Sequence, residues 1–234
     1  LILLTHFLRK RGELRFRRFA VSGALIGKVC KRGIPEAATQ LTTPVTALCY
    51  NLMLSRLIGD IGVSTFSVLS FLYSLANAIL SGVAQGLQPL WGLCYGRKDT
   101  DGMAWYLRSG LVINAVLSVL IYGGLFLFDV PVIRIFNQEP ALIQEASAAL
   151  PLFALSFVPM ALNLVYTAYF FSTKRTGTAN AIAVSRGIVV KALLIFCLPL
   201  LFGTKAIWLA PVVTEAVTLA AAIVLRRTSK LVYR

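Results

Sequence analysis

Four of the charged side chains inside the long apolar stretches of this sequence are the residues whose chemistry most needs an explanation. Glu36 opens the first stretch, Arg186 and Lys191 lie in the fifth, and Glu215 lies in the last. A charge within a helix that crosses lipid costs about 2.5–3.5 kcal/mol on insertion scales, so it usually faces a partner or a water-filled cavity. These four residues are therefore candidates for binding a ligand or moving an ion.

Lys191 and Glu215 stand at similar depths in consecutive stretches, each far from a helix end. Because consecutive antiparallel helices usually pack together, we expect Lys191 and Glu215 to form an ion pair inside the membrane. Arg186 either joins that cluster or extends its side chain to the surface. Glu36 has two interpretations that the sequence leaves open. It is a carboxylate stabilised by the positive end of a helix dipole, or a proton or cation site reached from the cytoplasm.

The composition explains why these stretches are assigned to a bilayer. Of the 234 residues, 58% are apolar and only 14% are charged, against roughly 25% charged in an ordinary soluble domain. A soluble fold of this size cannot cover so much apolar surface. A bilayer core needs about 20 apolar residues per helix, and the sequence supplies such runs repeatedly. We therefore expect an all-α integral membrane protein.

Six runs are long enough to span, and short loops with turn residues separate them. We place them at about 35–57, 63–93, 104–128, 142–172, 178–202 and 207–225. Residues 1–34 then comprise the end of a truncated transmembrane helix and a basic amphipathic cytoplasmic linker. Residues 35–225 form a six-helix bundle, and residues 226–234 form a basic cytoplasmic tail.

The net charge of +14 is distributed unevenly between the two sides of this bundle. Nearly all Lys and Arg residues fall in the amino-terminal segment, the even-numbered loops and the tail. The opposite side holds only Arg56, Arg134 and Lys205. The positive-inside rule then places both termini in the cytoplasm. It also explains the basic composition without nucleic acid as a partner.

The sequence lacks the motifs that would indicate an enzyme or a bound cofactor. It contains no Gly-rich phosphate loop followed by Lys-Ser/Thr, and no nucleophile-elbow serine. His6 is its one histidine, and its four cysteines have no metal-ligand spacing. We expect no catalytic residues, no cofactor and no metal.

One run is specific enough to carry a family resemblance. Gly82-Val83-Ala84-Gln85-Gly86-Leu87-Gln88-Pro89 closes a long helix and is followed by Tyr95-Gly96 and a basic loop. This run resembles the eighth helix of multidrug and toxic compound extrusion (MATE) transporters, especially their MepA-like bacterial branch. Gly33-Ile34-Pro35-Glu36 resembles the opening of the second lobe in that branch. Trp208-Leu209-Ala210-Pro211 with Glu215 resembles the twelfth helix, whereas Arg97-Lys98 and Ala206 depart from the pattern.

The resemblance implies that the chain is the C-terminal half of a twelve-helix transporter whose N-terminal six-helix lobe is missing here. It also implies a multi-pass protein of the bacterial inner (plasma) membrane. Members of the family export amphipathic, often cationic compounds by antiport with protons or sodium, through a cleft between two lobes. The expected partners are thus small organic, often cationic substrates, membrane lipid and the other lobe.

The resemblance further implies which side chains face that cleft or control it. In this sequence the cavity-facing candidates are Glu36, Gln40 and Asn51 on the first helix, and Asn163 and Tyr166 on the fourth. Tyr166 would add a cation–π contact of about 0.5–2 kcal/mol. Glu215, with Lys191 and Arg186, would set the stability of the lobe or its protonation.

Two other functions stay open at this point. A flippase for lipid-linked saccharides shares the architecture and uses a more cationic cavity, to which Lys191 and Arg186 would contribute. A six-helix membrane scaffold without a transport cycle is the other alternative.

Overall fold

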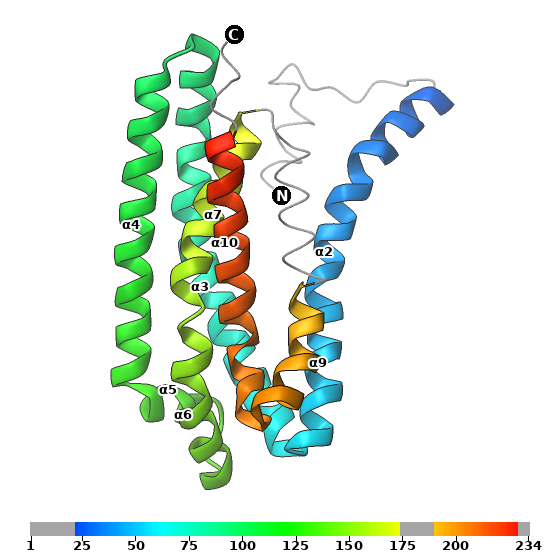
Figure 1. Ribbon diagram of the computed structural model, residues 1–234, viewed down its shortest axis with the longest axis vertical. Coiled ribbons are helices and arrows are strands. Elements are labelled where there is room, and N and C mark those ends of the chain that lie inside the picture. The colour runs from blue at the N-terminus through cyan, green and yellow to red at the C-terminus, as the bar shows by residue number, and fades with distance from the viewer. Residues whose placement is uncertain (1–21, 174–189, 229–234) are drawn as a thin grey trace, which may run out of the picture. The chain divides into compact units, whose positions relative to one another are not determined.

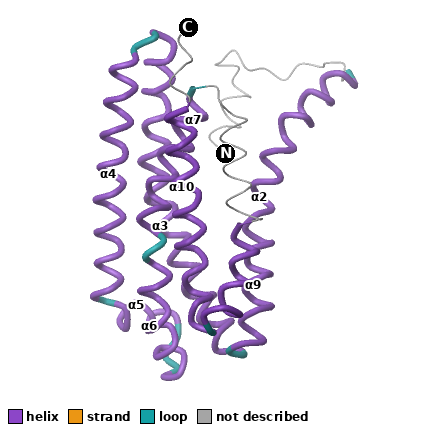
Figure 2. Tube along the Cα trace, viewed as in Figure 1, coloured by secondary structure: helices purple, strands orange, loops and turns teal. Residues whose placement is uncertain are grey.

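The computed structural model describes residues 22–173 and 190–228, without the side chains of residues 24–25, 28–40 and 227–228. Every element in this part of the chain is a helix, as the composition predicts (Figure 1). The elements are α2 (Gly23–Leu57), α3 (Asp60–Arg97), α4 (Thr100–Leu127), α5 (Asp129–Phe136), α6 (Pro140–Ala154), α7 (Phe157–Ser172), α9 (Lys191–Phe202), the 3₁₀ helix η2 (Thr204–Leu209) and α10 (Ala210–Thr228). Figure 2 shows how short the connections between most of them are.

By its contacts the chain divides into two units, Leu1–Ala37 and Ala38–Arg234, and the division falls within α2. In the first unit the structure describes the beginning of α2. This helix begins at Gly23, before the start that the sequence predicts for the first span at Pro35. Residues 1–21, where we place the truncated helix and part of the linker, lie outside the described residues, as does the tail from residue 229.

Within the second unit, two tight turns set α3 against its neighbours. Gly59 precedes α3 with φ of 82°, a conformation that glycine adopts without strain. At the other end of α3, the C-cap residue Lys98 has a left-handed backbone conformation with φ of 58°, and Asp99 is the N-cap of α4. The Asp99 carboxylate accepts a hydrogen bond from the Gly102 amide at 2.9 Å, which is the usual way to satisfy a free amide at a helix start.

The run predicted over 142–172 is a bent pair of helices. α6 and α7 meet at 41°, with Leu155 and Ser156 between them. Pro159 explains the bend, because it has no N–H for the Leu155 carbonyl and its ring crowds that oxygen. The Ser156 hydroxyl instead donates to the Phe153 carbonyl at 2.7 Å. The short helix α5, before this pair, is an element that the sequence analysis does not anticipate.

α3 lies at the centre of the packing in the second unit. It contacts α4, α6 and α7, while α7 also packs against α10, and α9 packs against η2 and α10. One apolar core includes Tyr50, whose ring stacks on Phe66 at 4.4 Å between centroids, together with Trp208. A second core gathers around Trp91 and Phe170.

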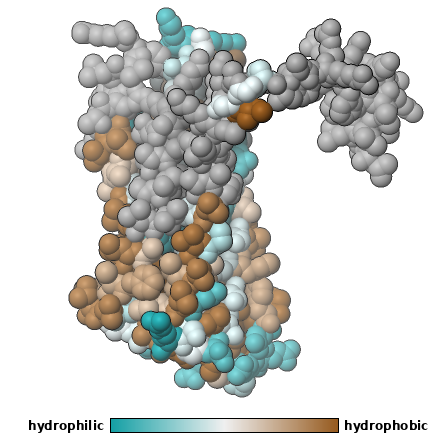
Figure 3. Space-filling view, turned by 90° about the vertical axis from the view of Figure 1, so that its right-hand side faces the viewer, coloured by the Kyte–Doolittle hydropathy of each residue, from teal (hydrophilic) through white to brown (hydrophobic). Residues whose placement is uncertain are grey.

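The outside of the second unit is apolar in the way that lipid contact requires. Val112, Val116 and Leu120 are all exposed and follow one another along α4, and Figure 3 shows apolar residues along much of the visible face with hydrophilic ones gathered at its lower end. Among the described residues, three helical segments are long and apolar enough to span a membrane: α3, α4 and Thr204–Arg226. The bent pair α6–α7 makes a fourth.

The other two predicted spans are incompletely described or more polar. α9 is apolar but covers only Lys191–Phe202, since residues 174–189 lie outside the described part. α2 has 35 residues, enough length to span, but it is not among the helices that are sufficiently apolar.

Candidate functional site

Glu215 is completely buried in the middle of this bundle, at 0% exposure on α10. The Asn163 side chain, from α7, donates to one carboxylate oxygen through Nδ2 at 2.8 Å. The same Nδ2 also donates to the backbone carbonyl of Glu215 at 2.9 Å. From α3, the Tyr73 hydroxyl donates to the second carboxylate oxygen at 3.4 Å. The carboxylate thus joins three helices.

The Tyr73 ring is itself held on several sides. It makes edge contacts with Phe153 and Phe157, with centroids 6.1 and 6.0 Å away. The Lys191 ammonium, at the start of α9, lies 5.5 Å from the centroid of the ring, which is within range of a cation–π interaction. Lys191 and Glu215 therefore both interact with Tyr73. The direct ion pair between them stays a prediction.

This arrangement makes the hydrogen bonding of the cluster depend on the charge of Glu215. An ionised carboxylate only accepts hydrogen bonds, and here it has donors on both oxygens. A protonated carboxyl group gains an O–H donor and keeps acceptor capacity, so the Tyr73 hydroxyl can then accept a hydrogen bond from Glu215 instead of donating one. The Asn163 Oδ1 atom is buried and has no hydrogen-bond partner among the described residues. The cluster can therefore respond to a proton by rearranging the contacts among α3, α7 and α10.

The remaining predicted site residues are more scattered. Tyr166 is 7% exposed and belongs to the second apolar core, while Asn51 is exposed on α2. Glu36 and Gln40 lie in α2, but their side chains are outside the description. Arg186 lies outside the described residues. Of the predicted set, the structure brings together Glu215, Asn163 and, through Tyr73, Lys191.

Sequence reasoning missed Tyr73, although a signal for it exists. A tyrosine within a long apolar helix has a hydroxyl that needs a partner when it leaves water, and Tyr73 is such a residue, partly buried on α3. Asn114 is a second polar residue whose role comes only from the structure. Its Nδ2 donates to the Leu80 carbonyl at 3.2 Å and to the Ala161 carbonyl at 3.1 Å, and so ties α4 to α3 and α7.

Within residues 22–173 and 190–228, no three His, Cys, Asp or Glu side chains are grouped closely enough to hold a metal ion. The chemistry of the cluster is that of one carboxylate with an amide, a phenol and a nearby ammonium.

Comparison with known proteins identifies the family. The family model described as MatE matches residues 35–197, well over half of the chain. The chain belongs to the MatE family. A comparison with curated protein sequences finds no match.

Solved structures of MATE proteins have the same fold. A MATE crystallised in complex with MaL6 superimposes with a TM-score of 0.83 at 14% identity, covering 97% of this chain and 52% of that one. The outward-facing form of a multidrug resistance MATE family transporter of the MOP superfamily gives 0.83 at 15% identity with the same coverage. A MOP superfamily transporter from Pyrococcus furiosus, described as having a binding pocket of reverse polarity, gives 0.81 at 17%, again covering 97% and 52%.

These matches confirm the predicted fold and family. The MatE chain is a multi-pass membrane protein with one helical lobe, and it spans about half the length of the structures that it matches. Two of the three structures are described as transporters. At these identities the likeness shows the fold alone, and the MepA-like branch stays a prediction.

Proposed function

We propose that this chain forms the C-terminal lobe of a secondary active exporter, in which a second six-helix lobe completes a central cleft. The exporter would move amphipathic, often cationic compounds out of the cell in exchange for protons or sodium. Membership of the MatE family and the half-length match to transporter structures support the architecture. The buried Glu215 cluster is the observation that supports the exchange mechanism.

The argument from Glu215 is energetic. A fully buried carboxylate in a membrane bundle is expensive, and a buried polar pair is often no more stable than apolar residues of similar volume. Stability alone therefore gives little reason to place Glu215 where it is 0% exposed. Transport would explain this position. If the carboxylate gains and loses a proton during a transport cycle, its contacts differ between two states of the lobe.

The available energy is sufficient for such a cycle. One charge moved through 100 mV supplies about 2.3 kcal/mol. That is comparable to the gain or loss of one or two hydrogen bonds to a charged group. Glu215 bonds to residues of α3 and α7, so a change in its charge would alter how these helices pack, and the two lobes would move relative to each other about the central site.

The other predicted residues have supporting parts in this proposal. Asn51, exposed on α2, is a candidate for direct substrate contact, as are Glu36 and Gln40 on the same helix. Asn163 and Tyr166 are buried within the lobe, so they would affect the cleft indirectly, by determining how the helices of its wall pack. The distribution of basic residues supports cytoplasmic termini, and the resemblance to the bacterial branch of the family supports the plasma membrane of a bacterium.

The test is exchange in proteoliposomes that contain the full-length protein, with the cationic dye ethidium as the substrate probe. An imposed proton or sodium gradient should drive ethidium across the membrane. Glu215→Gln should lower the gradient-driven rate at least about tenfold, a loss of about 1.4 kcal/mol of coupling. Glu145→Gln is the matched control, because Glu145 is a partly exposed glutamate of α6 outside the cluster, and it should leave the rate unchanged.

Full gradient-driven exchange by Glu215→Gln would contradict the proposed role of this carboxylate. Wild-type protein that accelerates flipping of a lipid-linked oligosaccharide, while it leaves ethidium in place, would instead favour the flippase alternative. No effect on either probe would favour the scaffold.

A further inference from the structure

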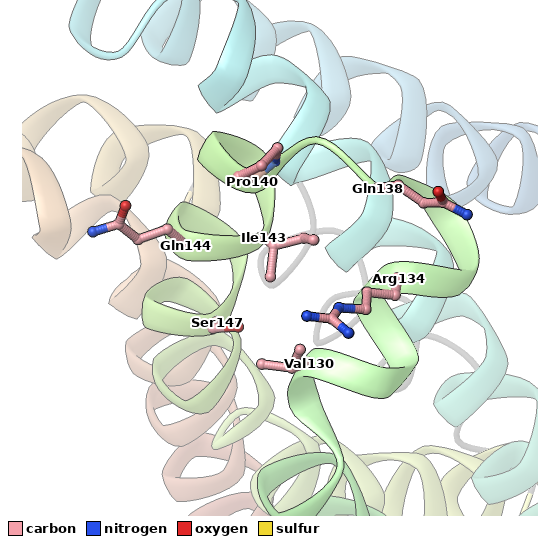
Figure 4. Close-up of a pocket in the computed structure, with 7 residues that line it drawn as sticks. All are labelled: Val130, Arg134, Gln138, Pro140, Ile143, Gln144 and Ser147. Atoms are coloured by element: carbon pink, nitrogen blue, oxygen red, sulfur yellow. The ribbon is translucent and has the colours of Figure 1, made fainter.

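A pocket of about 710 Å³ lies between α5 and the first half of α6, apart from the Glu215 cluster. This volume is within the range of about 300–1,000 Å³ that is usual for small-molecule sites. Val130 and Ile143 give it apolar walls, and Arg134 and Ser147 give it polar groups. In Figure 4 the Arg134 guanidinium extends from α5 into the space between these walls, while the amides of Gln138 and Gln144 point outward at the rims.

Both polar groups inside the pocket are without partners in the described part of the chain. No described carboxylate lies within ion-pair distance of Arg134, whose side chain is exposed. The Ser147 Oγ atom is buried and makes no hydrogen bond there. A guanidinium presents several donors in a planar fork that suits phosphate oxygens, and the buried Ser147 hydroxyl adds one more when its side chain turns toward the pocket. Together they match the phosphate of a ligand.

The surroundings indicate that this phosphate belongs to a lipid. Leu127 and Phe128, where α4 ends, and Ile135 and Phe136, at the end of α5, are exposed apolar side chains close in sequence to the lining of the pocket. These residues cover the surface where the acyl chains of a lipid would lie. A free inorganic anion would make no use of this apolar surface or of the apolar pocket walls. An amphipathic molecule makes use of both.

An acidic residue beside the pocket indicates the kind of headgroup. Glu139 is exposed and stands between two residues that line the pocket, Gln138 and Pro140. Its charge disfavours a ligand with a net negative charge and favours one that carries an ammonium beside its phosphate. We propose that the α5–α6 pocket binds the headgroup of a zwitterionic phospholipid, with its phosphate on Arg134 and Ser147.

On the orientation proposed above, this end of the bundle faces the outer leaflet, and a lipid there would join α5 to α6. The binding itself depends on neither the orientation nor the transport activity.

Native mass spectrometry of the full-length protein in detergent can measure this binding, with phosphatidylethanolamine as the probe. Arg134→Gln should weaken its binding about tenfold, as expected for the loss of one charge-assisted contact at a partly open site. Ser147→Ala should weaken it less. Arg56→Gln is the matched control, since Arg56 is an exposed arginine predicted on the same side and lines no part of the pocket, and it should bind as the wild type does.

Three comparison ligands test the assignment. Diacylglycerol with the same acyl chains should bind at least about tenfold more weakly, because it lacks the phosphate. Phosphatidylglycerol should bind more weakly than phosphatidylethanolamine, and inorganic phosphate should not displace either lipid. Unchanged binding in Arg134→Gln with an intact elution profile, or equal binding of diacylglycerol, would overturn the proposal. Displacement by inorganic phosphate would replace it with a free-anion site, and tighter binding of phosphatidylglycerol would refute the zwitterionic headgroup.

Discussion

Two buried asparagines provide a controlled test of how much the Glu215 carboxylate contributes to the lobe. Asn163 and Asn114 are 1% and 0% exposed, and each donates two hydrogen bonds through Nδ2 to neighbouring helices. Each also leaves its Oδ1 buried without a partner among the described residues. They differ in one respect. Asn163 donates to a carboxylate and a carbonyl, whereas Asn114 donates to two carbonyls.

Replacing each asparagine by leucine keeps the branched shape, adds the same extra bulk at both sites and removes these bonds. A neutral hydrogen bond contributes about 1 kcal/mol, and a hydrogen bond to a charged group contributes about 1.5–3 kcal/mol. Asn163→Leu should therefore destabilise the protein by about 0.5–2 kcal/mol more than Asn114→Leu. For 150–250 residues, 1 kcal/mol corresponds to a melting temperature roughly 2–4 °C lower. The difference between the two variants is thus measurable by thermal unfolding in detergent, followed by tryptophan fluorescence.

A double-mutant cycle isolates the charge. In a Glu215→Gln background, Asn163→Leu removes a bond to a neutral acceptor and should cost no more than Asn114→Leu does in the same background. The reasoning is refuted if Asn163→Leu and Asn114→Leu destabilise the protein equally, or if the larger cost of Asn163→Leu persists after the carboxylate has been removed.

Three further outcomes follow from the local contacts. Asp99→Ala removes the cap of α4 and should lower the free energy of unfolding by about 1 kcal/mol. Gly102→Ala places a new Cβ against the same carboxylate. The decrease in melting temperature of the double variant should therefore differ from the sum of the decreases in the two single variants. Tyr50→Phe removes a long hydrogen bond of 3.4 Å and should lower the free energy of unfolding by less than about 1 kcal/mol, whereas Tyr50→Ala should lower it by about 3–5 kcal/mol. Tyr73→Phe keeps the ring but removes the donor to Glu215, so initial rates of ethidium exchange should fall less than they do in Glu215→Gln.

Much of the fold was predictable because it follows from apolar periodicity and helix signals. Lengths of apolar sequence and the turn residues between them predict the long helices α3 and α4 to within a few residues of their observed ends. The bend at Leu155 was not predicted, although Pro159 was visible in the sequence. A proline inside a membrane helix is often accommodated without a large bend, so the packing around it decides the outcome.

The candidate site was predictable only in part. Glu215 and Asn163 stand out because polar side chains are costly in apolar helices. Their contact joins residues 52 positions apart in the sequence, and it follows from how α7 packs on α10, which no local pattern encodes. Tyr73 was missed because its ring makes it look like one more apolar residue of α3, and only its hydrogen bond to Glu215 in the folded structure shows where its hydroxyl is directed.

The most direct test of the proposed mechanism is whether the charge of Glu215 changes when the exporter binds a substrate. Infrared difference spectroscopy of the full-length protein, with and without ethidium, reports protonation changes through the C=O stretching bands of carboxyl groups. We predict a carboxyl difference band that is present in the wild type and in Glu145→Gln and absent in Glu215→Gln. The same band in Glu215→Gln as in the wild type would contradict the assignment of Glu215 as the residue that couples ion and substrate.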